Sequence, residues 1–186
     1  ARLARLRHLG RRTGSRSVTT VAIMQPTYLP WAGYFGLMDR VDHFVLLDSV
    51  QYDRRSWQQR NRIRAANGLL WLTVPVLHSG RSEQLITEVE LDPRADFARR
   101  HLGSIGTCYA RAPYLITYRT ELASHLEGGR ATGRLADLNR GVIQWLAAEL
   151  GIRTTVLRAS EVGGTGERST LLVDLCRRLD ASLETV

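Results

Sequence analysis

Residues 21–48, "VAIMQPTYLPWAGYFGLMDRVDHFVLLD", decide the fold. The apolar run at residues 21–24 predicts a short buried strand. Over residues 31–41 the apolar side chains recur at helical spacing, as Trp31, Tyr34, Phe35 and Met38. A second apolar run at residues 44–47 predicts another buried strand, which ends at Asp48. This strand, helix, strand order favours two parallel strands joined by a right-handed crossover.

The rest of the chain continues this α/β pattern. Residues 61–76 contain Asn67-Gly68 between two runs able to form strands, which predicts a β-hairpin. We further expect a half-exposed strand at 85–92, helices at 93–108, 113–126 and 135–150, a strand at 154–157 and a last helix at 170–179. The predicted fold class is therefore α/β, with a mostly parallel, Rossmann-like (nucleotidylyltransferase-like) sheet covered by helices and carrying a β-hairpin insertion.

Length and charge predict a single folded domain with a basic tail. The chain has 186 residues and a net charge of +8. Residues 1–20 contain six arginines and no acid, which leaves 20 arginines against 18 acids, or +2, in residues 21–186. We therefore expect a disordered basic tail at 1–20 and one domain at 21–186. The tail alone predicts weak, salt-sensitive attraction to polyanions, and no specific nucleic-acid binding is expected.

Composition excludes several kinds of chemistry. The chain has no lysine, which rules out a lysine nucleophile, a Schiff base and a Walker-type lysine. Its two cysteines form no zinc-binding pattern and its histidines are scattered, so we expect no metal site. No apolar segment long enough to span a membrane is present, and no export signal follows Arg11-Arg12. A cytoplasmic location is therefore expected.

The residues that follow the predicted strands are candidates for a site, because ligands bind beyond the carboxyl ends of parallel strands. Gln25 follows the first strand, and its amide suits a sugar hydroxyl or an amide substrate. Asp48 follows the second strand and can act as a general base, orient an amine or cap a helix. A turn glutamine and a capping aspartate are the structural alternatives, and both stay open.

Aromatic and basic residues nearby are candidates for substrate binding. Tyr28 and Trp31 lie among prolines in a turn, where large rings often contact ligands. Tyr34 is a candidate for the same binding surface, with a place in the core as the alternative. The stretch "DRRSWQQRNR" at residues 53–62 supplies guanidinium groups that match phosphate or carboxylate oxygens, next to an indole and an amide. Its candidate residues are Arg54, Arg55, Trp57 and Asn61. The alternative for this stretch is a solvated basic face.

Four motifs carry a family resemblance. The segments "MQPTYLPWAGYF", "DHFVLLDSVQY", "RRSWQQRNRI" and "NGLLWLTVPV" resemble the WbqC-like family of bacterial proteins, and the likeness extends from residue 21 to about residue 180. The resemblance implies a role in O-antigen and other surface-polysaccharide biosynthesis or in natural-product biosynthesis, with transfer of an acyl or aminoacyl group such as glycine. It also implies a further strand after residue 179, so we expect a domain shortened at its C-terminus.

The layout of the first strand, turn and helix is also similar to that of nucleotidylyltransferases. Aligning Gly33 with the glycine of their HxGH motif places Trp31 and Tyr34 at the two histidine positions. Neither side chain can serve as a cationic imidazole, so nucleotidyl transfer is not expected.

Three hypotheses for function remain. The first is a transferase that moves an acyl or aminoacyl group from a phosphorylated or carrier-bound donor to a sugar or amine, with no cofactor. The second is a non-catalytic module that binds a phosphorylated small molecule or a partner enzyme. The third is a nucleic-acid binder that uses the Arg-rich tail, against which the balanced core argues. The sequence does not determine the oligomeric state.

Overall fold

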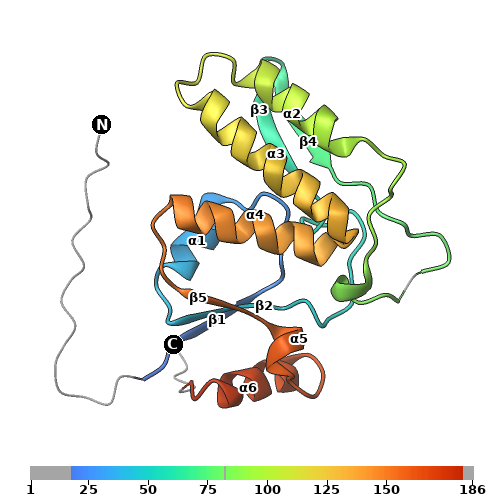
Figure 1. Ribbon diagram of the computed structural model, residues 1–186. Helices are drawn as coiled ribbons and strands as arrows, with labels where there is room; N and C mark the ends of the chain where they lie inside the picture. The colour runs from blue at the N-terminus through green and yellow to red at the C-terminus, as the bar shows by residue number, and fades with distance from the viewer. Residues whose placement is uncertain (1–17, 82, 182–186) are drawn as a thin grey trace.

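A computed structural model describes residues 18–81 and 83–181 and has a three-stranded parallel sheet at its centre. Its strands are β1 (Val21–Met24), β2 (His43–Leu46) and β5 (Thr155–Arg158), in the order β1-β2-β5 (Figure 1). Helix α1 (Ala32–Met38) connects β1 to β2, and Val21 pairs with His43 in parallel register. The predicted strand, helix, strand unit is therefore confirmed, and the chain has a mixed α/β fold.

Helices cover both faces of this sheet, which is why its strands read as continuous apolar runs. On one face, Phe44 and Leu46 of β2 pack with α1 and α4 (Leu135–Glu149). On the other face, Val45 packs with Leu171 and Leu175 of α6 (Ser169–Arg178). The short helix α5 (Ala159–Val162) follows β5 directly, and Figure 1 shows α5 and α6 on the side of the sheet opposite α1 and α4.

A second layer lies beyond α4 and contains the predicted hairpin. Strands β3 (Arg60–Ala65) and β4 (Gly68–Thr73) form a separate antiparallel pair, and Gly68 at the turn has a φ of 120°, which suits glycine. Helices α2 (Phe97–Cys108) and α3 (Leu115–Thr132) complete the layer (Figure 1). The larger hydrophobic core fills the space between these elements and α4, and includes Leu72, Phe97, Leu126 and Leu135.

The strand predicted for residues 85–92 is wrong. This segment instead forms the 3₁₀ helix η1 (Ile86–Glu88), flanked by isolated bridges such as Val76 to Leu91. Ile86 and Val89 are both fully buried although they are three residues apart. A 3₁₀ turn places residues i and i+3 on the same side, whereas a strand would place them on opposite sides.

Helix boundaries differ from the predicted ones for local reasons. Helix α2 begins four residues later than predicted, because the Asp96 side chain caps it by accepting from the Arg99 N–H. Helix α3 continues to Thr132, where Gly133 ends it with a φ of 69°.

Only the last residues of the predicted basic tail are described. Thr20 donates from its Oγ1 to Asp42 Oδ2 at 2.8 Å, and Thr19 bridges to Ala181. Residues 1–17 and 182–186 lie outside the described residues, as does the strand that the resemblance implies beyond the chain's last helix.

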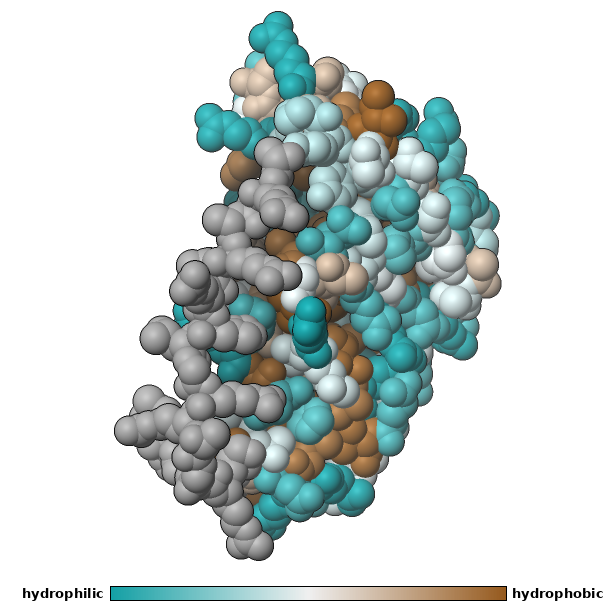
Figure 2. Space-filling view, turned by 60° about the vertical axis from the view of Figure 1, so that its left-hand side comes forward, coloured by the Kyte–Doolittle hydropathy of each residue, from teal (hydrophilic) through white to brown (hydrophobic). Residues whose placement is uncertain are grey.

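The described surface mixes hydrophobic and hydrophilic residues. On the side shown in Figure 2, brown hydrophobic stretches alternate with teal hydrophilic ones. Within the part of the chain that the structure describes, every helix is too short or too polar to cross a bilayer.

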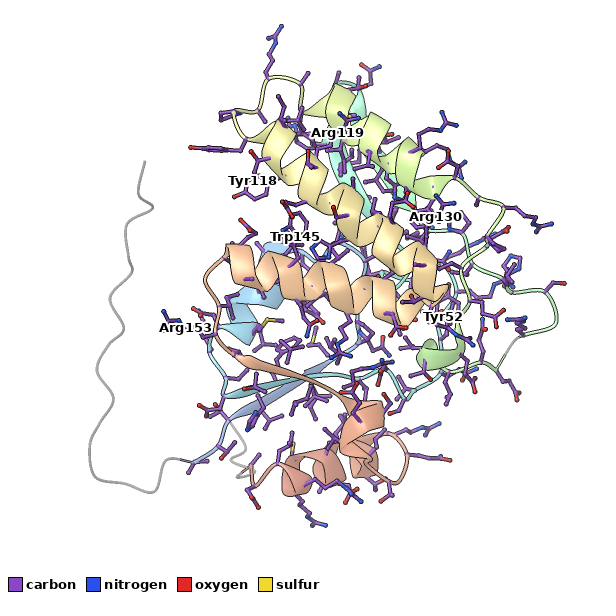
Figure 3. The ribbon with its side chains drawn as sticks, viewed as in Figure 1. Tyr52, Tyr118, Arg119, Arg130, Trp145 and Arg153 are labelled. Atoms are coloured by element: carbon purple, nitrogen blue, oxygen red, sulfur yellow. The ribbon has the colours of Figure 1, made fainter. Side chains whose placement is uncertain are left out.

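Helices α3 and α4 pack closely through a glycine. A Cβ built on Gly129 would lie 2.4 Å from Leu138 Cδ1, whereas one built on the preceding Gly128 would meet nothing within 4 Å. Farther along the same pair of helices, Trp145 reaches from α4 toward α3 and stacks on His125, with ring centroids 5.2 Å apart (Figure 3). A small residue at position 129 therefore sets how closely the two helices approach.

Replacing these neighbouring glycines should change stability in opposite directions. Gly129→Ala should lower the free energy of unfolding by about 1–3 kcal/mol, because the added methyl group overpacks the α3–α4 contact. Gly128→Ala should raise it by up to about 1 kcal/mol, since alanine is the better helix former and the site is open. Urea unfolding of both variants measures this difference. Equal effects from both would contradict the close packing at Gly129.

Candidate functional site

Polar side chains gather where the parallel strands end. Gln25 directly follows β1, Asp48 follows β2 and Ser160 follows β5. Asp48 and Ser160 contact each other, and the turn after β1 is hydrogen-bonded to the Arg-rich loop that precedes β3. We refer to this group at the carboxyl edge of the sheet as the polar centre.

Asp48 is buried and accepts three hydrogen bonds. Its Oδ2 accepts from Arg158 Nε at 2.5 Å and from Ser160 Oγ at 2.9 Å, and its Oδ1 accepts from the Ser160 N–H at 3.0 Å. Arg158 also donates to Asp137 Oδ1 at 3.1 Å. Burial is the largest single influence on Arg158 and opposes its charge, but the bond to Asp48 together with the charges of Asp48, Asp137 and Glu161 outweighs it and raises the pKa of the guanidinium. These contacts favour an anchoring role for Asp48, and its catalytic role stays a prediction.

A chain of side-chain amides fixes how Gln25 is oriented. The Asp53 N–H donates to Gln58 Oε1 at 3.3 Å, so the other amide atom of Gln58 must be the nitrogen. That Nε2 donates to Gln25 Oε1 at 3.0 Å. Gln25 is an exposed residue, and its Nε2 donates to no other residue in the part of the chain that the structure describes. Gln25 therefore has hydrogen-bond donors to offer to a ligand.

Asn139 joins the two loops of the polar centre to α4. Its Nδ2 donates to the carbonyl of Pro26 at 3.2 Å and to the carbonyl of Gln58 at 2.7 Å. The residue is fully buried, and its Oδ1 has no hydrogen-bond partner in the described part of the chain. A buried acceptor without a partner is uncommon and marks a place where water or a ligand group can bind.

Further buried hydroxyl groups near these strand ends also lack partners among the described residues. They are Thr27 Oγ1, Ser49 Oγ and the Tyr52 hydroxyl. Thr27 and Ser49 follow directly on Pro26 and Asp48, and burial raises the pKa of Tyr52 to about 12, which keeps its hydroxyl protonated. The polar centre thus holds several groups able to accept or donate hydrogen bonds.

Tyr28, predicted to line a pocket, lies in the core. It is completely buried, and its hydroxyl lies 2.9 Å from His101 Nδ1. His101 Nε2 lies 3.1 Å from the Thr73 carbonyl, which can only accept, so the proton is on Nε2 and the Tyr28 hydroxyl donates to Nδ1. Burial lowers the pKa of His101 to about 4. This pair is a neutral, satisfied core contact.

The other predicted aromatic and amide residues have contrasting positions. Trp31 is 67% exposed and covers Gly33, whereas Tyr34 is buried and donates to the Gln25 carbonyl at 3.3 Å. Asn61 holds the turn by donating to the Tyr28 and Leu29 carbonyls. Only Trp31 of these is accessible in the way that a binding wall requires.

The backbone of the Arg-rich loop is hydrogen-bonded to the turn after β1, while several of its side chains are exposed to solvent. The Trp57 carbonyl accepts from the Tyr28 N–H at 2.9 Å, which ties the loop to the turn after β1. Arg54 and Arg55 are exposed, and Arg55 has a φ of 60°, a costly conformation for a residue with a side chain. Trp57 itself is 47% exposed. The loop therefore presents cations and an indole beside the polar centre.

Three hollows of the described structure lie elsewhere. One of about 320 Å³ is lined by residues of 91–97 and 127–133, and two others adjoin the tip of the hairpin. A common pocket for Gln25, Asp48 and Arg55 stays a prediction. Across residues 18–81 and 83–181, no group of three or more His, Cys, Asp or Glu side chains is placed to hold a metal ion.

Sequence reasoning missed several residues of the polar centre. Gln58 lies within the stretch "DRRSWQQRNR", and Arg158 and Ser160 lie at the end of β5 and just after it. Asn139 carried the clearest signal, because it is a polar residue on the apolar face of α4, four residues after Leu135. A polar side chain at a core position of an amphipathic helix indicates a buried hydrogen-bonding role.

Asp48→Asn should destabilise the fold by about 3 kcal/mol, because it leaves the mostly buried Arg158 without its main partner. Asp137→Asn is the matched control: this second partner of Arg158 is more exposed, and its loss should cost less than about 1 kcal/mol. Urea unfolding compares the two. If Asp48→Asn unfolds like the parent, Asp48 is not an anchor and its role as a base gains ground.

His101 should make stability depend on pH. Its pKa is about 4 when folded and 6.5 in the unfolded chain, so the unfolded chain binds the proton more readily between these values. The free energy of unfolding should therefore fall as the pH drops from 7 to 4, by at most about 3 kcal/mol from this residue. His101→Gln, which can still donate to Thr73, should show a shallower pH dependence. Parallel curves for the two proteins would contradict this assignment.

Comparisons with known proteins identify the family. The chain is 35% identical over 163 residues to the uncharacterized protein Rv1507c of Mycobacterium tuberculosis, an alignment that covers 87% of this chain and 69% of that protein. No solved structure matches the chain with significance. Residues 25–184 match the model of the WbqC-like protein family. The predicted resemblance is confirmed, and the chain belongs to the WbqC-like protein family.

Proposed function

We propose that this protein is a transferase that moves an acyl or aminoacyl group, such as glycine, from an anionic donor to a sugar or a small amine. The reaction takes place in the cytoplasm during the assembly of a surface polysaccharide or a specialised metabolite. The donor is phosphorylated or carrier-bound, and the substrate lies at the carboxyl edge of a Rossmann-like sheet. The proposal rests on the geometry of the polar centre, and the pathway rests on the family resemblance.

The observation that carries the proposal is the fixed amide of Gln25. Its Oε1 is held by Gln58, whose own orientation is set by the Asp53 N–H, so the Gln25 N–H groups are left to donate to a substrate. An amide held in advance of reaction can donate to the carbonyl oxygen of an acyl donor and stabilise the negative charge that develops there. Because the second amide restrains the first, less side-chain freedom is lost when the substrate binds.

The exposed arginines beside Gln25 suit an anionic donor. Arg54 and Arg55 lie on a loop that Asn61 and the Trp57 carbonyl hold against the turn after β1. Both guanidinium groups can contact phosphate oxygens in a bidentate way. Trp31 and Trp57, both well exposed, then limit the position of the acceptor.

The chemistry needs little beyond positioning. The nitrogen of a neutral amine attacks the acyl carbon, the new C–N bond forms, and the bond to the donor's oxygen or sulfur breaks. The leaving group keeps the electron pair, and the amine proton passes to the leaving group or to water. We assign Asp48 to the positioning of Arg158 and Ser160, because its Oδ2 accepts from both side chains.

A non-catalytic binding module is the second candidate. The observation in its favour is that Asp48, the carboxylate nearest the strand ends, is buried and paired. A protein whose acidic group is fully used for structure can still hold a phosphorylated molecule or a partner enzyme through the same arginines.

Gln25→Glu tests the proposal directly. The new carboxylate still accepts from Gln58 but cannot donate to an oxyanion, so transfer should fall by about a hundredfold or more while the fold is retained. The assay mixes the protein with a glycyl thioester of N-acetylcysteamine and a panel of amino sugars, and detects the amide product by mass spectrometry. Arg153→Gln is the control, because Arg153 lies near the α4–β5 loop, away from Gln25.

Unchanged transfer by Gln25→Glu would refute the assigned role of this amide. If the parent protein forms no product with any donor but binds phosphorylated compounds, and Arg55→Gln weakens that binding, the binding module is the better description.

A further inference from the structure

One face of the β3–β4 hairpin is open and has an unusual composition. Residues directly opposite in an antiparallel pair share a face, and Arg60 pairs with Thr73, Arg62 with Trp71 and Arg64 with Leu69. The other face contributes Leu72 to the core. We refer to the outer face as the hairpin face; it comprises Arg60, Arg62, Arg64, Leu69, Trp71 and Thr73.

Two indoles and two guanidinium groups stack on this face. Trp57 and Trp71 have ring centroids 5.6 Å apart and planes inclined by 34°. The Arg62 guanidinium carbon lies 5.3 Å from the Trp57 ring and 5.2 Å from the Trp71 ring, and that of Arg60 lies 4.4 Å from Trp71. Both indoles remain nearly half exposed. The two indoles thus expose a large aromatic surface to solvent, next to two cations. Such a surface suits an anionic ligand that carries planar groups.

Arginine dominates the charge of the segments that form the hairpin and the elements next to it, although residues 21–186 are nearly neutral overall. Residues 54–82 contain six arginines and no acid, and residues 97–120 contain four arginines and no acid. Within residues 18–81 and 83–181, several of these arginines form no salt bridge, namely Arg54, Arg55, Arg60, Arg62, Arg64 and Arg111. Their charge is available to an external anion.

The face continues into a hollow at the hairpin tip. This hollow of about 770 Å³ lies between the hairpin turn and the loop from α2 to α3, and Arg64, Tyr109 and Arg111 line it. The Tyr109 hydroxyl accepts from the Arg64 N–H at 3.3 Å, which joins the two walls. Indoles, arginines and the hollow thus form one track along the hairpin.

We propose that this track binds single-stranded nucleic acid without strong sequence preference. Such binding combines cations that follow the backbone with aromatic rings on which bases stack, often on an open sheet face. Arginines at alternate positions of β3 are about 7 Å apart, which approaches the spacing of phosphates along an extended single strand. The track therefore matches a polymer in which charge and planar rings alternate.

The shape of the surface favours a polymer over a small molecule. A small ligand is normally enclosed over most of its surface, whereas the hairpin face is open sheet. An acidic protein would satisfy the arginines, but it would leave the indole faces and the hollow without planar groups to fill them. The inference does not rest on transferase activity, because it uses neither Gln25 nor Asp48, although Trp57 and the arginines of its loop belong to both surfaces.

The test measures fluorescence anisotropy of short labelled oligo(dT) and oligo(U) with the full chain at several salt concentrations. Trp71→Ala should weaken binding at least about fivefold with little change in the salt dependence, since it removes a stacking platform. Arg64→Gln should reduce the slope of log K against log salt by about 0.7. Circular dichroism checks that both variants remain folded.

Matched controls separate this face from general charge. Arg153→Gln removes the same charge as Arg64→Gln at a position well away from the hairpin in Figure 3, and should leave affinity and slope nearly unchanged. A variant without residues 1–17 should keep the effect of Trp71→Ala. The proposal is overturned if binding disappears with the tail, if Arg64→Gln and Arg153→Gln behave alike, or if polyglutamate competes as well as the unlabelled oligonucleotides.

Discussion

The two hydrogen bonds from Asn139 to the Pro26 and Gln58 carbonyls determine how the parts of this protein are joined. One buried amide on α4 satisfies two loops that are 113 and 81 residues away in sequence. A buried carbonyl without a donor costs free energy comparable to a lost hydrogen bond, so neither loop can leave α4 cheaply. Gln58 in turn orients Gln25. The position of α4 therefore influences the orientation of the exposed Gln25 amide through Gln58.

Charge is divided between two tasks in this chain. Asp48, Arg158 and Asp137 form a mostly buried network that fixes the end of β5 against the end of β2. Burying such a network costs desolvation free energy, but separating its members would leave a buried charge unpaired and would cost more. The network therefore specifies where α5 begins. The arginines of residues 54–64 are instead exposed, except for the half-buried Arg60, and form no salt bridge within the described chain, so their charge can serve a ligand.

Local patterns could be predicted from the sequence, and distant partnerships could not. The parallel pair is predicted from short apolar runs, and the hairpin from Asn67-Gly68. Both signals depend on residues that are close together in the sequence. The strand predicted at residues 85–92 is wrong because the alternation of apolar and polar residues suits a strand, whereas hydrogen bonds to the Val50 and Asp48 carbonyls hold the backbone in η1. Gln25 was predicted as a site residue, but its free donors depend on Gln58 and Asp53, and no local pattern contains that information.

The polar centre and the hairpin face share a single loop, and this limits how independently they can move. The Trp57 carbonyl holds the turn after β1, while its indole packs against Trp71 on the hairpin. Gln58, the next residue, reaches back to Gln25. A ligand that displaces the Trp57 ring therefore pulls on the same backbone that orients the donor amide. Since Asn139 fixes the Gln58 carbonyl, the displacement is opposed by α4, and the loop acts as a stiff link between the two surfaces.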